Sequence, residues 1–416
     1  MIKVSNISDK RWFMGKGEKI KSIREMDSIS IGGTLLAILE ILFENGTRDL
    51  YTFIENEIFM GKILEEAFAG GATESIFPTE KGFFDFKAAC ILPTKHLRTV
   101  KPFALEQSNS AFVSPGKIFF KLFRRLQAGT HPEVEIMEHL NKADFQATPR
   151  FFARCSYKAD SGEVYTIGIL EEHLTQVSDA WSVFNSSMDT ELADELGAAT
   201  ARMHRALKNL DGSESHAEEV PFEKLRGLLK KAIETSDDSG TDADKRPKDL
   251  FQKVLDRLPE LEKICIHQKA RAESPESNSA ADIFTPQRIH GDFHLGQVLV
   301  EQSNSDDTTK TTPGIKIIDF EGEPTRPLEF RRKLRSPAVD IAGMLRSFRY
   351  AAANAHSDSS AAEQAFIAGY SRISGISPNQ ILQAAEPYIL AKAVYEACYE
   401  LEFRPTWFWI PAQALL

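Results

Sequence analysis

Two acids and an amide occur in two short segments of this chain, in a pattern that suits phosphoryl transfer. Residues 290–297 read HGDFHLGQ, so that Asp292 is followed five residues later by Gln297. Residues 316–322 read KIIDFEG and place Asp319 at the end of an apolar strand. Transfer of a phosphoryl group from ATP needs one carboxylate that orients the attacking hydroxyl, together with an amide and a second carboxylate that hold Mg²⁺. We therefore predict that Asp292 is the catalytic base and that Gln297 and Asp319 bind Mg²⁺.

This interpretation rests on Asp292, Gln297 and Asp319 occurring together at these spacings. An isolated Asp after His-Gly is most often a turn or cap residue. Here H-x-D-x-x-x-x-Q stands where protein kinases carry H-R-D-x-x-x-x-N, and DFEG stands where they carry DFG. Three parts in the right order are a more specific signal than one motif alone.

Lys121 is the upstream candidate for a nucleotide-binding residue. It lies within the apolar strand predicted for residues 117–123, where a lysine is costly unless it is paired. A phosphate and a helix glutamate would pair it, whereas the alternative is a lysine at a strand end that reaches water. The next helix begins in the form of a capping box with Glu133 as its acid. Glu135 and Glu138 are then available, and we predict that Glu135 pairs with Lys121.

Two further segments are predicted to contact the nucleotide. Small polar residues precede the hairpin that contains Lys121, where a phosphate-covering loop belongs, although the glycine pattern G-x-G-x-x-G is missing and an ordinary turn is the alternative. Residues 170–174 follow a strand and precede the helical part, where backbone groups would face the adenine. The residues assigned to the nucleotide in these segments are Gln107, Ser108, Asn109, Ser110, Glu171 and His173.

The helix predicted near the C-terminus is the candidate acceptor site. Tyr395 and Tyr399 share one face, while Glu396, Glu400 and Arg404 recur at the same interval on the adjoining face. Carboxylates and a guanidinium can bind sugar hydroxyls, and aromatic rings can cover sugar C–H groups. The alternative is a surface helix with ion pairs and two half-buried tyrosines. The residues assigned to the substrate are His294, Glu321, Asp340, Arg346, Tyr395, Glu396 and Arg404.

Composition narrows the class of protein. The chain has 416 residues, 42% of them hydrophobic, and a formal net charge of −10. The acidic balance argues against nucleic-acid and anionic-membrane partners. The four cysteines are scattered, no apolar run reaches membrane-spanning length, and the first ten residues lack a signal-peptide core. We therefore expect a cytoplasmic protein with no membrane partner.

The order of predicted elements indicates an α+β fold with three parts. Strands at 35–43 and 49–54 flank the turn signal Asn45-Gly46, and the strands 111–113 and 117–123 flank Ser114-Pro115-Gly116. Beyond residue 181 the periodic segments are helical, notably 191–207 and 377–403, and Pro387 is expected to break the latter into two helices. We predict an N-terminal cap subdomain at 1–95, an ATP-binding subdomain at 96–175 and a helical lobe at 176–416.

Beyond these motifs, the chain resembles the bacterial maltokinases, which are aminoglycoside-phosphotransferase-like members of the protein-kinase-like superfamily. The resemblance rests on RWFMGKG at 11–17, KLFRRL at 121–126, the two catalytic segments, DIAGMLRS at 340–347, KAVYE at 392–396 and RPTW at 404–407. It implies a bilobal kinase-like fold with an extra β-rich cap and a mainly helical C-lobe. It also implies ATP and Mg²⁺ as cofactors, and maltose as the acceptor.

The product implied by this resemblance is maltose 1-phosphate, which would enter glycogen or α-glucan synthesis from trehalose and suggests an association with trehalose synthase. Glucosamine kinases share the ATP-site residues, so glucosamine, another sugar or an aminoglycoside is the alternative acceptor. A pseudokinase scaffold is a different class of alternative, but it would not need to retain Lys121, Asp292, Gln297 and Asp319 together.

Overall fold

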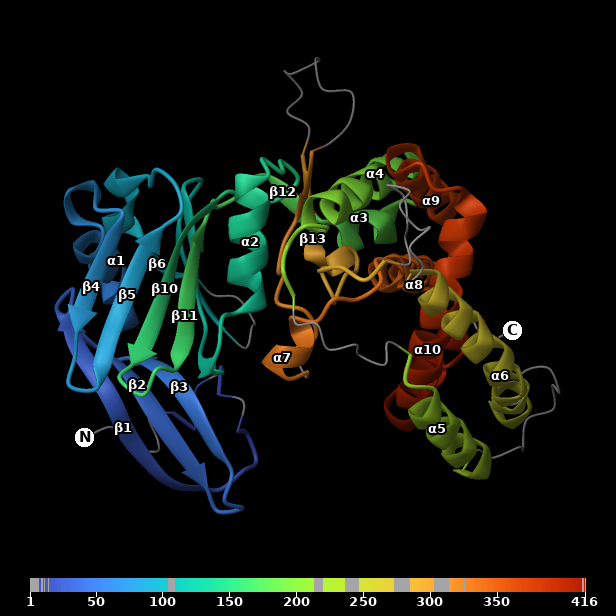
Figure 1. The fold of residues 1–416 in the computed structure, drawn as a ribbon, viewed down its shortest axis with the longest axis horizontal. Coiled ribbons are helices and arrows are strands. Elements are labelled where there is room, and N and C mark those ends of the chain that lie inside the picture. Colours follow the sequence, from blue (N-terminus) through green and yellow to red (C-terminus); the bar gives the residue numbers. More distant parts are fainter. Residues whose placement is uncertain are drawn as a thin grey trace. The chain divides into compact units, whose positions relative to one another are not determined.

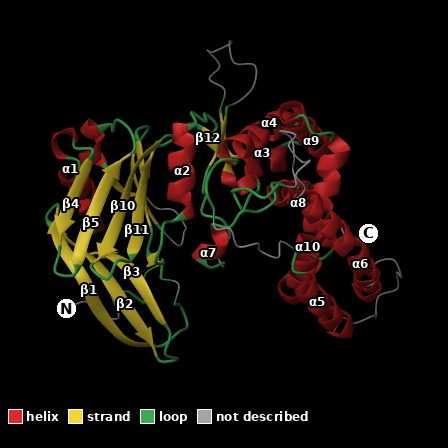
Figure 2. Ribbon diagram, viewed as in Figure 1, coloured by secondary structure: helices red, strands yellow, loops and turns green. Residues whose placement is uncertain are grey.

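The computed structural model describes residues 7–8, 10, 12–13, 15–103, 109–212, 220–235, 247–272, 285–302, 314–324, 326–413 and 415, with only the backbone at 264 and 267–272. The chain divides into two compact units, Met1–Gln176 and Val177–Leu416. The first is rich in strands and the second is mainly helical (Figures 1 and 2). This arrangement confirms the predicted α+β fold class.

The N-terminal sheet has the strand order β1-β2-β3-β9 within the described residues. Gly46, with φ of +87°, allows the tight turn between β2 and β3 that the Asn45-Gly46 signal predicted. Trp12 and Phe13 join the apolar core on one face of this sheet, against Phe43 and Tyr51. The strands are β1 (Ile20–Ile31), β2 (Thr34–Phe43), β3 (Arg48–Ile54) and β9 (Arg125–Leu126).

The larger sheet has the order β4-β5-β10-β11-β8-β7-β6 in the described part of the chain. The predicted hairpin at 114–116 is confirmed, because β7 and β8 pair from Ser114 with Ile118 onward. The first unit also contains helices α1 (Met60–Ala67) and α2 (Pro132–Lys142). The strands are β4 (Glu74–Pro78), β5 (Gly82–Ala88), β6 (Lys101–Phe103), β7 (Ser110–Ser114), β8 (Ile118–Leu122), β10 (Phe151–Ala159) and β11 (Val164–Glu171).

The predicted boundary at residue 95 falls within this larger sheet. β5 precedes residue 95 and pairs antiparallel with β10, which follows it. The two sheets of the unit are therefore not separated at that position, and the division into a cap and an ATP-binding subdomain stays a prediction.

The second unit combines helices with a small sheet of order β12-β13-β14, counted over the described residues. The strands are β12 (Val177–Asp179), β13 (Val298–Glu301) and β14 (Ile315–Ile317). The helices are α3 (Ala180–Ser186), α4 (Thr190–Leu207), α5 (Phe222–Thr235), α6 (Pro247–Ala272), α7 (Leu328–Arg331), α8 (Ala338–Asn354), α9 (Ser360–Ser374), α10 (Pro378–Phe403) and α11 (Trp409–Gln413).

Helix α10 begins as predicted but does not break at Pro387. Ser377 caps it in a capping box with Gln380, and Pro378 occupies the first turn. The helix then continues through Pro387 to Phe403. A proline inside a helix forfeits one backbone hydrogen bond, at a cost of about 3 kcal/mol. Pro387 is itself buried, and α10 packs on α8 and α5, so tertiary packing outweighs the local preference.

Helices α4 and α9 cross with their backbones in contact. A Cβ atom added to Gly197 of α4 would lie 1.9 Å from the carbonyl oxygen of Phe366, and one added to Gly369 of α9 would lie 1.9 Å from that of Asp194. Both separations are far below van der Waals contact. Glycine at these two positions therefore permits the close crossing.

Among the described residues, no helix is both long enough and apolar enough to cross a lipid bilayer.

We predict that Gly197→Ala lowers the free energy of unfolding by about 1–3 kcal/mol, because the added methyl group must push α9 away. Gly227 is the matched control, since it is exposed in α5 and an added Cβ would have no atom within 4 Å. Gly227→Ala should raise the stability by up to about 1 kcal/mol. Urea denaturation of both variants checks this. Equal effects of the two substitutions would contradict the close crossing.

Candidate active site

The segment that carries Asp292 is held by a buried carboxylate on helix α8. Asp340 is 1% exposed. Its Oδ2 accepts a hydrogen bond from the backbone N–H of His290 (2.8 Å), and its Oδ1 accepts one from that of Gly291 (2.9 Å). Two consecutive N–H groups next to Asp292 therefore have fixed partners.

Asp340 is in turn held by His204 of α4. His204 Nε2 lies 3.1 Å from Asp340 Oδ2, and His204 Nδ1 lies 3.0 Å from the hydroxyl of Tyr370 on α9. Burial and the charge of Asp340 raise the pKa of Tyr370, so its hydroxyl stays protonated and can donate to Nδ1. Burial acts to raise the pKa of Asp340, but the hydrogen bond and electrostatic effect of the His204 ring, with His290 and the Gly291 N–H, lower it overall. Asp340 therefore stays ionised as an acceptor.

Two more contacts along α8 dock the same segment. A Cβ atom on Gly343 would lie 2.4 Å from the carbonyl oxygen of Phe293, so only glycine allows this approach. Ser347 Oγ accepts a hydrogen bond from the backbone N–H of Leu295 at 3.1 Å. Asp340, Gly343 and Ser347 are spaced by three and four residues and so share one face of the helix.

The segments that carry Asp292 and Asp319 are joined to each other by His290. The ring Nε2 of His290 lies 2.9 Å from the carbonyl oxygen of Ile318, next to Asp319, and its Nδ1 accepts from the Asp292 N–H at 3.4 Å. Phe293 and Phe320 flank this ring, with centroids 5.1 and 4.9 Å away. One side chain thus fixes both acids relative to each other.

The structure places the side chains of Gln297 and Asp319, both predicted to bind Mg²⁺, next to each other. Gln297 Nε2 donates a hydrogen bond to Asp319 Oδ2 at 3.0 Å. The amide nitrogen of Gln297 therefore faces Asp319, and its amide oxygen points away from Asp319. Asp319 has φ of +65°, a backbone conformation that few residues other than glycine adopt, but that Asp tolerates better than most. Each of the two side chains carries an oxygen that could serve as a ligand, and oxygen is the donor that Mg²⁺ prefers.

His294 lies close to these acids, and Lys392 lies close to His294. Burial lowers the pKa of His294, while the charges of Asp292 and Asp319 act to raise it and those of His290 and Lys392 act to lower it. His294 Nδ1 accepts a hydrogen bond from the Gly296 N–H at 3.1 Å. Lys392 Cε would lie 3.7 Å from a Cβ atom on Gly343. Lys392 was not among the predicted site residues, although its motif at 392–396 was noted.

In the first unit, Lys121 is paired, but the predicted partner needs correction. Lys121 Nζ lies 3.0 Å from Glu133 Oε2, and the two side chains are 9% and 2% exposed. The prediction assigned Glu133 to a capping box and Glu135 to Lys121. Helix α2 instead begins at N-cap His131 without a side-chain cap hydrogen bond. The carboxylate of Glu133 is thus available to the strand, and Glu135 lies two positions further along the helix.

The other residues predicted to bind the nucleotide are only partly described. Gln107 and Ser108 lie outside the described residues. Asn109 and Ser110 lead into β7, and their side chains contact Arg124. Glu171 ends β11 and is buried, and His173 Nδ1 accepts a hydrogen bond from the Gly116 N–H at 3.0 Å. Burial lowers the pKa of His173, so its Nδ1 is suited to this acceptor role.

Comparisons with known proteins agree with this geometry. A family model described as the phosphotransferase enzyme family matches residues 99–322, more than half of the chain. The chain belongs to that family. The glucosamine kinase of Mycolicibacterium smegmatis is 22% identical over 343 residues, 76% of this chain and 79% of the relative. A glucosamine kinase of Streptacidiphilus jiangxiensis is 24% identical over 248 residues, 55% of this chain and 50% of the relative.

Solved structures show that this phosphotransferase shares its fold with sugar kinases. A glucosamine kinase in crystal form B superposes with a TM-score of 0.68 at 17% identity, over 98% of this chain and 97% of that one. A glucosamine kinase in complex with glucosamine, ADP and inorganic phosphate superposes with a TM-score of 0.64 at 17% identity, over 95% and 93%.

In this phosphotransferase the predicted acceptor residues are not equally accessible. Tyr395 is 38% exposed, whereas Arg346 is 2% exposed and its Nε bonds Glu396 Oε2 at 2.9 Å. Arg404 pairs with Glu400 at 2.6 Å, as its spacing of four residues suggests. The backbone carbonyl of Glu321 accepts from Arg331 at 3.0 Å.

Asp340 departs most from its predicted role. Its carboxylate is buried and both of its oxygens accept hydrogen bonds from the protein, so it is a positioning residue and not a sugar contact. The sequence patterns missed His204, and they assigned Glu133 and Asp340 to other roles. A histidine among the buried positions at the end of α4 and an acid in the apolar first turn of α8 were the available signals.

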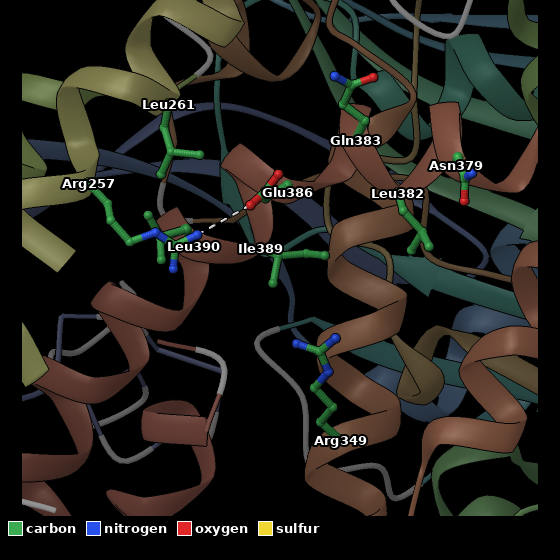
Figure 3. Close-up of a pocket in the computed structure, with 9 residues that line it drawn as sticks. All are labelled: Arg257, Leu261, Arg349, Asn379, Leu382, Gln383, Glu386, Ile389 and Leu390. Atoms are coloured by element: carbon green, nitrogen blue, oxygen red, sulfur yellow. Dashed lines mark hydrogen bonds and ion pairs between the residues drawn. The ribbon is translucent and has the colours of Figure 1, made fainter. Parts of the chain in front are cut away.

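A cavity of about 480 Å³ between α6, α8 and α10 is separate from these residues (Figure 3). Arg257, Arg349 and Glu386 lie at its polar parts, and Leu382 and Ile389 supply apolar surface. None of the predicted site residues lines it.

We predict that Asp340→Asn lowers both stability and turnover. The amide has one accepting oxygen where the carboxylate has two. Its NH₂ group would therefore face a backbone N–H and leave that buried donor without a partner. The free energy of unfolding should fall by about 1–3 kcal/mol. Urea denaturation and kcat measured on folded protein check this, with the exposed Asp256→Asn as the control. Wild-type stability together with wild-type kcat in Asp340→Asn would refute the role of this carboxylate.

Proposed function

We propose that this phosphotransferase transfers the γ-phosphoryl group of ATP to a hydroxyl group of a sugar. The observation that carries the proposal is the rigid link between Asp292 and Asp319. Asp340 holds the backbone before Asp292, and His290 bonds the carbonyl group next to Asp319. Phosphoryl transfer depends on positioning and electrostatics more than on covalent chemistry, so rigidly held acids are what the reaction needs.

Each polar residue has a proposed role in this reaction. Asp292 would orient the acceptor hydroxyl and take its proton. Gln297 and Asp319 would hold Mg²⁺, which neutralises charge on the phosphates when it is bound. Lys121, kept in place by Glu133, would bind phosphate oxygens, and Asn109, Ser110, Glu171 and His173 would lie along the nucleotide, with Gln107 and Ser108 in the covering loop.

For the acceptor, we propose maltose, with maltose 1-phosphate as the product. The support is the resemblance of 392–396 and 404–407 to maltokinases and the polar residues of α10, which include Tyr395 and Glu396, with Arg404 as its C-cap residue. Glu400 is 1% exposed, and its Oε2 has no hydrogen-bond partner among the described residues. A role in glycogen or α-glucan synthesis, and an association with trehalose synthase, belong to this proposal.

Glucosamine is the second candidate acceptor. The curated relatives and the superposed structures are named glucosamine kinases, and one of those structures contains glucosamine and ADP. These proteins have low sequence identity to this chain, so the acceptor can differ between them. Contacts in the acceptor pocket decide which acceptor is used, even where the residues for phosphoryl transfer are the same.

An acceptor panel separates the two candidates. ADP release with Mg·ATP should be measured with maltose, glucose, glucosamine and kanamycin at equal concentrations. We expect the highest kcat/KM with maltose, and phosphate on the anomeric oxygen of the product by NMR. A preference for glucosamine would replace maltose by the second candidate, and no turnover with any sugar would refute the proposed function.

We predict that Asp292→Ala lowers kcat by about 10²–10⁴-fold, the usual contribution of a positioned general base. Asp292 is half-buried at the end of a turn, so the fold should be retained. The melting temperature and its increase with Mg·ADP should be those of the wild type. Near-normal turnover in this variant would show that another group is the base.

A further inference from the structure

Arg124 is a fully buried arginine for which the proposed reaction has no role. It is 0% exposed, and it lies between β8 of the larger sheet and β9 of the N-terminal sheet. Each of its three guanidinium nitrogens has a partner within the first unit. Nε donates to Ser110 Oγ at 2.8 Å, Nη1 donates to the carbonyl oxygen of Thr52 at 3.2 Å, and Nη2 bonds the carboxylate of Glu57.

The partners of Arg124 come from both sheets. Thr52 belongs to β3, and its backbone N–H also donates to the carbonyl oxygen of Arg124 at 2.8 Å. The ring of Trp12, in the core of the N-terminal sheet, lies 4.6 Å from the guanidinium carbon. On the other side, Asn109 Oδ1 accepts from the Arg124 backbone N–H at 3.3 Å. One residue thus connects the N-terminal sheet to the start of β7.

The place where Arg124 holds β7 is next to Lys121. Ser110 pairs with Leu122 across the β7–β8 ladder, and the next residue, Ala111, pairs with Lys121 itself. Asn109 and Ser110 are also the described end of the predicted phosphate-covering loop. A shift of these two residues would therefore displace them relative to the lysine proposed to bind phosphate.

Burying the charged guanidinium of Arg124 costs free energy, so we expect this side chain to have a function. Burial lowers the pKa of Arg124 to about 10, although Glu57 acts to raise it. The guanidinium fork matches three acceptors at fixed angles, which the single ammonium group of a lysine cannot do. A packed apolar side chain could fill the same space without the desolvation cost.

We propose that Arg124 is a positioning residue for the nucleotide, through which the N-terminal sheet holds Asn109 and Ser110 in register with Lys121. This inference rests on the proposed function, since that function assigns Asn109 and Ser110 to ATP. In this inference the N-terminal sheet affects the affinity for the nucleotide and does not affect the affinity for the acceptor.

The test compares KM for ATP with KM for the acceptor. Arg124→Lys keeps the charge but loses the fork, and we expect KM for ATP to rise about tenfold, the effect of losing one hydrogen bond to a charged group. KM for the acceptor should not change. Glu57→Gln should have a smaller effect in the same direction. The matched control is Arg125→Gln, because Arg125 also pairs with the N-terminal sheet, at Asp49, but its side chain is 49% exposed.

Each outcome decides between the alternatives. If Arg124→Lys loses stability while KM for ATP stays at the wild-type value, Arg124 is only a structural residue and the inference is wrong. If Arg124→Lys does not accumulate as folded protein, Glu57→Gln carries the same comparison, since it removes the charged partner of the guanidinium. Failure of Mg·ADP to raise the melting temperature of the wild type would instead refute the nucleotide site itself.

Discussion

The hydrogen bonds from two backbone N–H groups to Asp340 are the interaction on which the candidate site depends. A buried carboxylate without partners would be strongly destabilising, so its surroundings must supply donors. Here the donors are the backbone of His290 and Gly291 and the ring of His204. Asp340 also lies in the first turn of α8, where the helix dipole favours a negative charge. The carboxylate and the catalytic loop therefore stabilise each other.

This interaction ties the chemistry of the loop to the helical core. His204 comes from α4 and Tyr370 from α9, and these two helices cross closely at Gly197 and Gly369. The loop is docked further along α8 at Gly343 and Ser347. Because interiors are close-packed, the position of Asp292 is then set by the packing of three helices and not by its own short segment.

The parts that could be predicted from sequence are those that local patterns determine. Asn45-Gly46 predicts a tight hairpin because Asn and Gly adopt the positive φ that such a turn requires, and Gly46 has φ of +87°. The spacing of Asp292, Gln297 and Asp319 predicts which residues would act on Mg·ATP. The wrong assignments concern tertiary contacts. Glu133 looked like a helix cap, but it lies opposite Lys121 only once β8 and α2 are packed. Asp340 looked like a sugar contact because the pattern carries no information about burial. Pro387 was expected to break α10, but packing against α8 and α5 keeps the helix intact.

The account holds that Asp340 acts on catalysis through the position of Asp292. A double-mutant cycle on kcat measures this directly, with Asp292→Asn, Asp340→Asn and the double variant in single-turnover transfer from γ-labelled ATP. If Asp340 acts through Asp292, the double variant should be no slower than Asp292→Asn alone. Fully multiplicative losses of rate in the double variant would contradict the account, because they would mean that the two carboxylates act independently.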